Sequence, residues 1–180
     1  GPDRAMVFQD LNQLFPWKTT LKNVVYPLKV NKLYSNNENR LETGRKYLRM
    51  VGLSENFDNA FPHQLYGGMK QRVAIARALA LDPKVLLMDE PFGSIDAQTR
   101  TGLQEELLKI WEDTQKTIMF VTHNIEEAIL LGTRICVLGT NPGRVLEVFD
   151  NPIEPPRIAT DPGFADFWKT LFNLLGHKDD

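Results

Sequence analysis

Apolar and polar residues alternate along this chain in blocks whose lengths suit short strands and longer helices. Short apolar runs predict strands at residues 4–8, 85–88, 117–122 and 134–138. Helical spacing of apolar residues occurs between them, in the segments 69–81, 97–115 and 125–131. Strands separated by helices connect through right-handed crossovers, so we predict an α/β fold with a parallel sheet and helices on both faces.

The longer helices have predicted buried faces. On the helix at 69–81, the residues predicted to be buried are Met69, Val73, Ala76 and Ala80. The residues of that helix predicted to point away from the core are Lys70, Arg72 and Arg77. On the helix at 97–115, the predicted buried stripe is Leu103, Leu107, Ile110 and Trp111.

Two further regions have helical character. Residues 10–64 are interrupted by prolines and contain a polar patch, so we predict several short helices there. A proline-rich stretch at 151–156 has the composition of a linker, and aromatic and leucine residues then follow at helical spacing from Phe164 to Leu175. This terminal amphipathic helix is predicted to dock on its own domain in preference to a partner.

Charge, cysteine content and the lengths of the apolar runs limit the classes of function that this chain could have. The chain has 180 residues, with 23 acidic against 21 basic residues and a net charge of −2, so electrostatics gives no argument for nucleic-acid binding. The single cysteine, Cys136, lies in an apolar run and is predicted to be buried, and no internal disulfide can form. No apolar stretch is long enough to cross a bilayer.

Two glycines, Gly67 and Gly68, stand directly before the helix at 69–81. A glycine pair at a helix start leaves backbone N–H groups free at the positive end of the helix dipole, which suits an anion such as phosphate. Glycines also open helices for steric reasons alone. Considered by itself, the pair favours this structural explanation.

Asp89 and Glu90 follow the apolar strand at 85–88. Charge at the tip of a buried strand is costly unless something offsets it. One carboxylate can enter a Mg²⁺ shell while its neighbour, which points the other way, polarises a water molecule. A solvated strand end is the alternative explanation.

Together these features resemble the ATP-binding-cassette (ABC) ATPases that drive membrane transporters. The segment 85–91 resembles their Walker B strand, and 65–69 resembles the LSGGQ signature motif. The segment 94–96 is similar to the D-loop. Gln9, which closes the first strand, resembles the Q-loop glutamine, and His123, after the third strand, resembles the switch histidine.

The resemblance implies a branch, a fold and a domain organisation. Segments 1–10, 14–17 and 92–100 look most like importer ATPases for nitrate, sulfonate, taurine or related compounds. The implied fold is a P-loop NTPase-like parallel sheet joined to an α-helical signature subdomain. Residues 1–150 would form part of an ABC ATPase domain, divided into a catalytic-core portion (1–9 and 82–150) and a helical subdomain (10–81). Residues 151–180 would form the linker and terminal helix.

The resemblance also implies a role for each residue that matches a family motif. Glu90 is expected to be the general base, and His123 to stabilise charge on the γ-phosphate. Asp89 and Gln9 are expected to act in the Mg²⁺ shell. The residues expected to contact ATP, some of them across a dimer, are Gln9, Tyr66, Gly67, Gly68, Met69, Ser94 and Asp96. His63 and His177 are interpreted as surface or loop residues.

Two departures from the family pattern affect these expectations. No Gly-Lys dipeptide exists in the sequence, so the G-x-x-x-x-G-K-[ST] phosphate loop is not found. That loop precedes the Q-loop in the family, so the chain is expected to be a fragment that hydrolyses ATP weakly or not at all. Tyr66 stands where the family has serine, and its ring either swings aside or impairs the composite site.

The resemblance therefore implies a peripheral ATPase subunit at the cytoplasmic face of the cell membrane. Its expected partners are a transmembrane permease subunit and a second ATP-binding subunit, in a homodimer or heterodimer. A solute-binding protein would act indirectly, and no nucleic acid is expected. The alternatives are a non-catalytic truncated module that only binds partners and a soluble ABC ATPase without a transport role.

Overall fold

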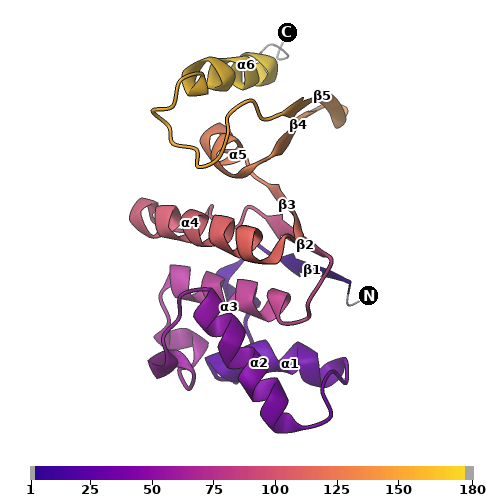
Figure 1. Cartoon of the computed structure of the whole chain (residues 1–180), viewed down its shortest axis with the longest axis vertical. Coiled ribbons are helices and arrows are strands. Elements are labelled where there is room, and N and C mark those ends of the chain that lie inside the picture. Colours follow the sequence, from indigo (N-terminus) through magenta and orange to yellow (C-terminus); the bar gives the residue numbers. More distant parts are fainter. Residues whose placement is uncertain (1–2, 177–180) are drawn as a thin grey trace. The chain divides into compact units, whose positions relative to one another are not determined.

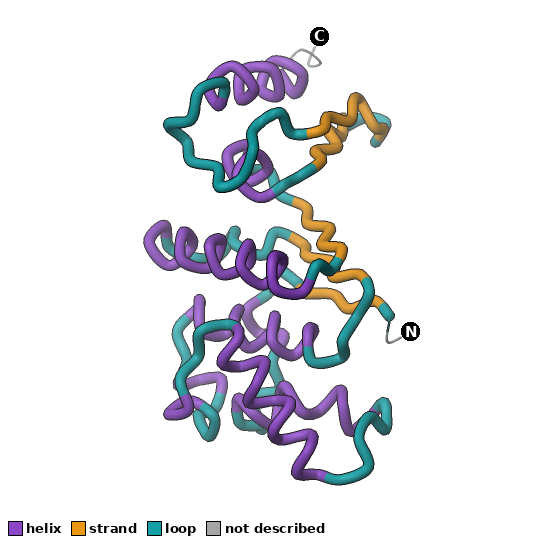
Figure 2. The backbone as a smooth tube through the Cα atoms, viewed as in Figure 1, coloured by secondary structure: helices purple, strands orange, loops and turns teal. Residues whose placement is uncertain are grey.

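The computed structural model describes residues 3–176, and the chain divides into two compact units, Gly1–Val121 and Thr122–Asp180. Figure 1 labels the elements along the chain, and Figure 2 distinguishes helices from strands. None of the helices among residues 3–176 has the length and apolar character needed to cross a lipid bilayer.

A three-stranded parallel sheet forms the centre of the first unit. Its strands are β1 (Arg4–Val7), β2 (Val85–Asp89) and β3 (Thr117–Val121), in the order β1-β2-β3. Val7 pairs with Met88, and Asp89 pairs with Val121. The register therefore places the carboxyl ends of all three strands at one edge of the sheet.

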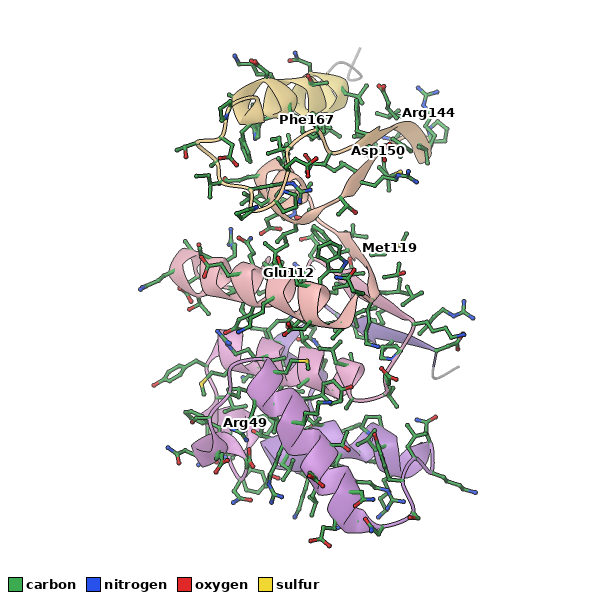
Figure 3. The ribbon with its side chains drawn as sticks, in the orientation of Figure 1. Arg49, Glu112, Met119, Arg144, Asp150 and Phe167 are labelled. Atoms are coloured by element: carbon green, nitrogen blue, oxygen red, sulfur yellow. The ribbon has the colours of Figure 1, made fainter. Side chains whose placement is uncertain are left out.

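The two faces of this sheet differ in burial. Ala5 and Val7 on β1 are buried and pair in register with the buried Leu86 and Met88 on β2. Helix α3 contacts β1. On β3, Met119, labelled in Figure 3, is 63% exposed.

Helices α1 (Thr20–Val30), α2 (Asn37–Met50) and α3 (Gly67–Leu79) pack on one another. Side chains cap the first two, because Thr19 accepts from the backbone N–H of Lys22 and Asn36 from that of Asn39. Short 3-10 helices lie at η1 (Leu11–Gln13), η2 (Glu55–Phe57) and η3 (Pro62–Gln64). The predicted helical character of residues 10–64 is confirmed, although α1 and α2 are longer than predicted.

Helix α3 is enclosed on more than one side, and this corrects the prediction of a single buried face. Val73 and Ala76 are buried as predicted, but Met69 is half-buried. Arg72 and Arg77, predicted to point away from the core, are half-buried and hydrogen-bonded to other segments. Simple periodicity missed this because α3 contacts β1, α1, α2, α4 and η1.

Helix α4 (Ala97–Thr114) follows the prediction closely. Leu103, Leu107 and Ile110 are buried, whereas Trp111 is only half-buried. Gln115 ends the helix in the left-handed conformation at φ 51°.

The second unit contains α5 (Ile125–Leu131), β4 (Arg134–Gly139), β5 (Arg144–Asp150) and α6 (Phe164–Gly176). The fourth strand was predicted correctly, but it does not join the parallel sheet. It pairs antiparallel with β5, which was not predicted. Helix α6 packs on α5 and β4, so the predicted docking of the terminal helix on its own domain is confirmed. The Phe149 and Phe167 ring centroids are 5.8 Å apart, and Phe167 lies on the side of α6 that faces this hairpin (Figure 3).

Cys136 is exposed, which corrects the prediction of a buried thiol. The β4–β5 hairpin packs through one face, where Ile135 and Val137 are buried. Because side chains alternate along a strand, Cys136 lies on the opposite face.

Gly68 allows α3 to approach α4 closely, and its replacement tests this packing. A Cβ at position 68 would lie 2.3 Å from Cγ2 of Thr99, whereas one at Gly67 meets only Leu11 Cδ1, at 3.2 Å. We expect Gly68→Ala to lower the free energy of unfolding by roughly 1–3 kcal/mol, measured by urea denaturation, and Gly67→Ala to lower it less. Adding Thr99→Ser removes Cγ2 and should recover most of the loss. Equal stability of Gly68→Ala and the original chain would contradict this account.

Candidate functional site

The carboxyl edge of the parallel sheet brings together two of the predicted site residues. Gln9 lies two residues after the end of β1, and Glu90 directly follows β2. The Gln9 Nε2 atom lies 3.5 Å from Glu90 Oε2, at the long end of hydrogen-bond distance. Residues 81 positions apart in the sequence therefore meet at one point of the sheet edge.

The backbone at Glu90 makes a sharp turn as the chain leaves β2. Glu90 has φ 41°, in the left-handed region that non-glycine residues rarely occupy. Its N–H donates to the Val121 carbonyl at 2.9 Å, and its own carbonyl accepts from the Gly93 N–H at 3.1 Å. These two bonds hold the turn, and the unusual backbone conformation is of the kind that concentrates at functional sites.

Gly93 is a further residue of this corner, and it was not among the predicted site residues. A Cβ at this position would lie 3.2 Å from both Gln9 Nε2 and Glu90 Oε2. Any larger residue would crowd the two side chains, so glycine leaves the space between them open. Only the folded backbone reveals this, because Gly93 is distant from Gln9 in the sequence.

Asp89 is the last residue of β2, and it is exposed. Its carboxylate, with the Glu90 carboxylate and the Gln9 amide at the same edge, supplies the oxygen donors that Mg²⁺ prefers. Within residues 3–176 no cluster of three or more His, Cys, Asp or Glu side chains could hold a metal by itself. The arrangement fits an ion that keeps several water or substrate ligands, as Mg²⁺ commonly does.

The signature segment starts α3. Tyr66 is its N-cap residue, makes no side-chain capping bond and is 83% exposed. Gly67 and Met69 are half-buried, and Gly68 is buried against Thr99. Packing thus explains why a glycine stands at position 68. The backbone N–H groups in the first turn of the helix have no partner within the helix and are suited to bind an anion.

Ser94 and Asp96 lie in the loop between β2 and α4, and both are exposed. Asp96 is the N-cap of α4 and accepts from the Thr99 N–H at 3.0 Å. Hydrogen bonds from Thr99 hold the pKa of the Asp96 carboxyl below its usual range. The carboxylate therefore has a structural role in starting α4.

His123 belongs to the second unit, where hydrogen bonds fix the loop around it. The Thr122 hydroxyl donates to Glu127 Oε2 at 2.6 Å and accepts from the Asn124 N–H at 3.0 Å. Asn124 caps α5 by accepting from the N–H groups of Glu126 and Glu127. His123 itself is exposed. The buried Glu127 was not predicted as part of this loop.

The other histidines were predicted to be surface or loop residues. His63 is exposed in η3, with its ring stacked on Phe61 at 5.9 Å between centroids. His177 lies outside the described residues.

Comparison with known proteins identifies the family. The ABC transporter family model matches residues 2–93. The chain is 49% identical over 188 residues to the taurine import ATP-binding protein TauB of Rhizobium johnstonii, covering 100% of this chain and 70% of that protein. It is 42% identical over 192 residues to the nitrate import ATP-binding protein NrtD of Synechococcus elongatus, covering 100% and 68%. The chain therefore belongs to the ATP-binding proteins of ABC transporters.

A solved structure supports the same assignment. The fold matches the dimeric post-hydrolysis state of the ATP-binding cassette MJ0796 bound to ADP and Pi, with a TM-score of 0.65 and 40% identity over 74% of this chain and 57% of that chain. The predicted family and α/β fold class are confirmed. The chain spans 65% to 70% of the length of the curated relatives that it matches from end to end.

The lowered pKa of Asp96 predicts a pH-dependent contribution to stability. A group whose pKa is lower in the folded state stabilises the fold above its unfolded pKa, about 3.9 for Asp, and this contribution is lost as the pH falls through the folded pKa. Asp96→Asn keeps a capping oxygen but removes the charge, so we expect it to be less stable than the original chain at pH 7 and equally stable once the pH lies below the folded pKa of Asp96. Urea midpoints across this range measure the difference. A constant difference between the urea midpoints of the two proteins at every pH would show that the Asp96 charge does not contribute to stability.

Proposed function

We propose that this chain is part of the ATP-hydrolysing subunit of an ABC importer, which couples ATP hydrolysis to solute uptake. The observation that carries the proposal is the meeting of Gln9 and Glu90 at the carboxyl edge of a parallel sheet, 3.5 Å apart. Ligands of open α/β sheets bind at this edge. The motif order along the chain supports the same site.

The proposed solute is a small anion or zwitterion of the nitrate or taurine type. The similar proteins TauB and NrtD are named for import of taurine and nitrate. The resemblance to this branch implies that other subunits would select the solute. We therefore propose ATP hydrolysis as the function of this protein. The solute class is proposed from similarity alone.

Each predicted site residue has a role in the proposed reaction. Glu90 would orient a water molecule for in-line attack on the γ-phosphate and accept its proton. Asp89 and Gln9 would hold Mg²⁺, which neutralises charge on the phosphate oxygens when bound. His123 would donate a hydrogen bond to the γ-phosphate as negative charge develops.

The signature segment would complete the site of a second ATP-binding subunit. The exposure of Tyr66 and the free N–H groups of the first α3 turn support this role. Ser94 and Asp96, also exposed, would contact the partner across the dimer. The similar cassette MJ0796 forms a dimer in its ADP-bound and Pi-bound state.

An aromatic cluster in the first unit would contact the transmembrane permease at the cytoplasmic side of the membrane. The Phe15 ring lies 5.7 Å from Trp17 and 4.7 Å from Tyr26 between centroids, with the Lys18 ammonium 4.9 Å from the Tyr26 centroid. Trp17 is 70% exposed. Exposed aromatic side chains on an ordered surface are common anchors at protein interfaces.

Replacing Glu90 tests the proposed function. Glu90→Gln keeps the side-chain shape but removes the general base, so we expect kcat for ATP hydrolysis by the whole protein to fall about 100-fold or more, with little change in KM. Steady-state phosphate release measures both. Glu105→Gln, an exposed site on α4, makes the same charge change as a control. An active Glu90→Gln protein would overturn the assignment of the base.

Tyr66→Ser separates capping from the proposed nucleotide contact. Serine is a favoured N-cap residue, and the exposed ring contributes little burial. We expect the free energy of unfolding to rise by about 0.5–1 kcal/mol, and the ATPase rate of the whole protein to increase. A stability gain without a rate gain would show that the tyrosine is tolerated at the composite site.

A further inference from the structure

We propose that Arg77 is a positioning residue for Gln9, and that it links the signature helix α3 to the corner where Gln9 meets Glu90. The inference rests on the proposed function of Gln9 and Glu90. Its basis is a continuous chain of contacts within the first unit, from α3 through η1 to the end of β1.

The first link joins α3 to η1. The Arg77 Nη1 atom donates to the Gln13 carbonyl at 2.8 Å, and Nη2 donates to Gln13 Oε1 at 3.3 Å. Both bonds come from one planar guanidinium group, which can hold a residue at two points. Burial lowers the pKa of Arg77, but a guanidinium remains charged at neutral pH. A partly buried charge of this kind requires such partners.

The second link joins Gln13 to the residue before Gln9. Gln13 Nε2 donates to the Phe8 carbonyl at 2.8 Å, and Gln13 Oε1 accepts from the Phe8 N–H at 3.4 Å. The side chain thus pairs with both backbone polar groups of Phe8, much as a neighbouring strand would. Because Phe8 directly precedes Gln9, these bonds set the direction in which Gln9 leaves β1.

The same guanidinium also contacts the aromatic cluster. Arg77 Cζ lies 5.8 Å from the centroid of the Phe15 ring, within cation–π range. A displacement of either α3 or Phe15 would therefore reach Gln13 through Arg77. This places Arg77 between the proposed permease surface and Gln9.

Arg72 provides a matched control on the same helix. It too is half-buried, and it donates to the Val51 carbonyl at 2.7 Å and pairs with Glu106. These contacts tie α3 to α4 and to the end of α2, and none involves η1 or β1. Loss of Arg72 therefore removes a comparable packing interaction without touching the path to Gln9.

The experiment compares Arg77→Met and Arg72→Met in the whole protein, by steady-state ATP hydrolysis and thermal unfolding. We expect both variants to lower the melting temperature. Arg77→Met should also lower kcat roughly 10- to 100-fold with KM for ATP nearly unchanged, because small misplacements of a catalytic group cost this much. Arg72→Met should leave kcat close to that of the original protein below its melting temperature. Equal kcat losses in the two variants would overturn the proposal.

Gln13→Glu separates positioning from stability. Glutamate still accepts from Arg77 but cannot donate to the Phe8 carbonyl, so only the second link loses a bond. We expect kcat to fall while the melting temperature stays close to that of the original protein. An unchanged kcat in this variant would contradict the path through Phe8.

A double-mutant cycle distinguishes failure of this inference from failure of the proposed function. If Arg77 acts through Gln9, Arg77→Met should have little further effect on kcat in a Gln9→Ala background. Additive effects of the two substitutions would overturn the inference while leaving the ATPase assignment intact. If Gln9→Ala and Glu90→Gln both leave kcat unchanged, the proposed function itself fails.

Discussion

The parallel pairing of β1, β2 and β3 is the constraint on which the site depends. Its register puts Val7 opposite Met88 and Asp89 opposite Val121, so the three strands end at one edge. Residues that leave those ends are brought together whatever their separation in sequence. A shift of one residue in this register would turn the buried side chains toward the other face, and the corner of Gln9 and Glu90 would be lost.

Around this edge, both side-chain packing and hydrogen bonds act on Gln9 and Glu90. Glu90 turns sharply out of β2, and the space beside it is kept open by Gly93. Gln9 emerges from β1 in a direction set by two hydrogen bonds between the Gln13 side chain and the Phe8 backbone, one donated by each residue. The corner is therefore assembled by the backbone of two loops, and α3 contributes to it from a distance through Arg77.

The signature segment illustrates how one residue can serve two purposes. Gly68 lies where any side chain would meet Thr99, so close packing of α3 on α4 is enough to require glycine there. The same helix start exposes N–H groups suited to phosphate. The structural and functional explanations of the glycine pair are thus compatible. Tyr66 beside it packs against little, because its ring is largely exposed.

Short apolar runs and motif spacing are local properties, so the amino-acid sequence was enough to predict the family, the strands β1 to β4 and the approximate bounds of α3, α4, α5 and α6. It was not enough to predict β5 or the bounds of α1 and α2. It also indicated Gln9, Asp89, Glu90 and His123 as site residues, whose roles stay predictions. The pairing of β4 with β5, the exposure of Cys136 and the hold of Arg77 on Gln13 became known from the folded chain alone. The physical reason is that strand partners and the neighbours of a half-buried side chain come from segments distant in sequence, which periodicity within one segment cannot specify.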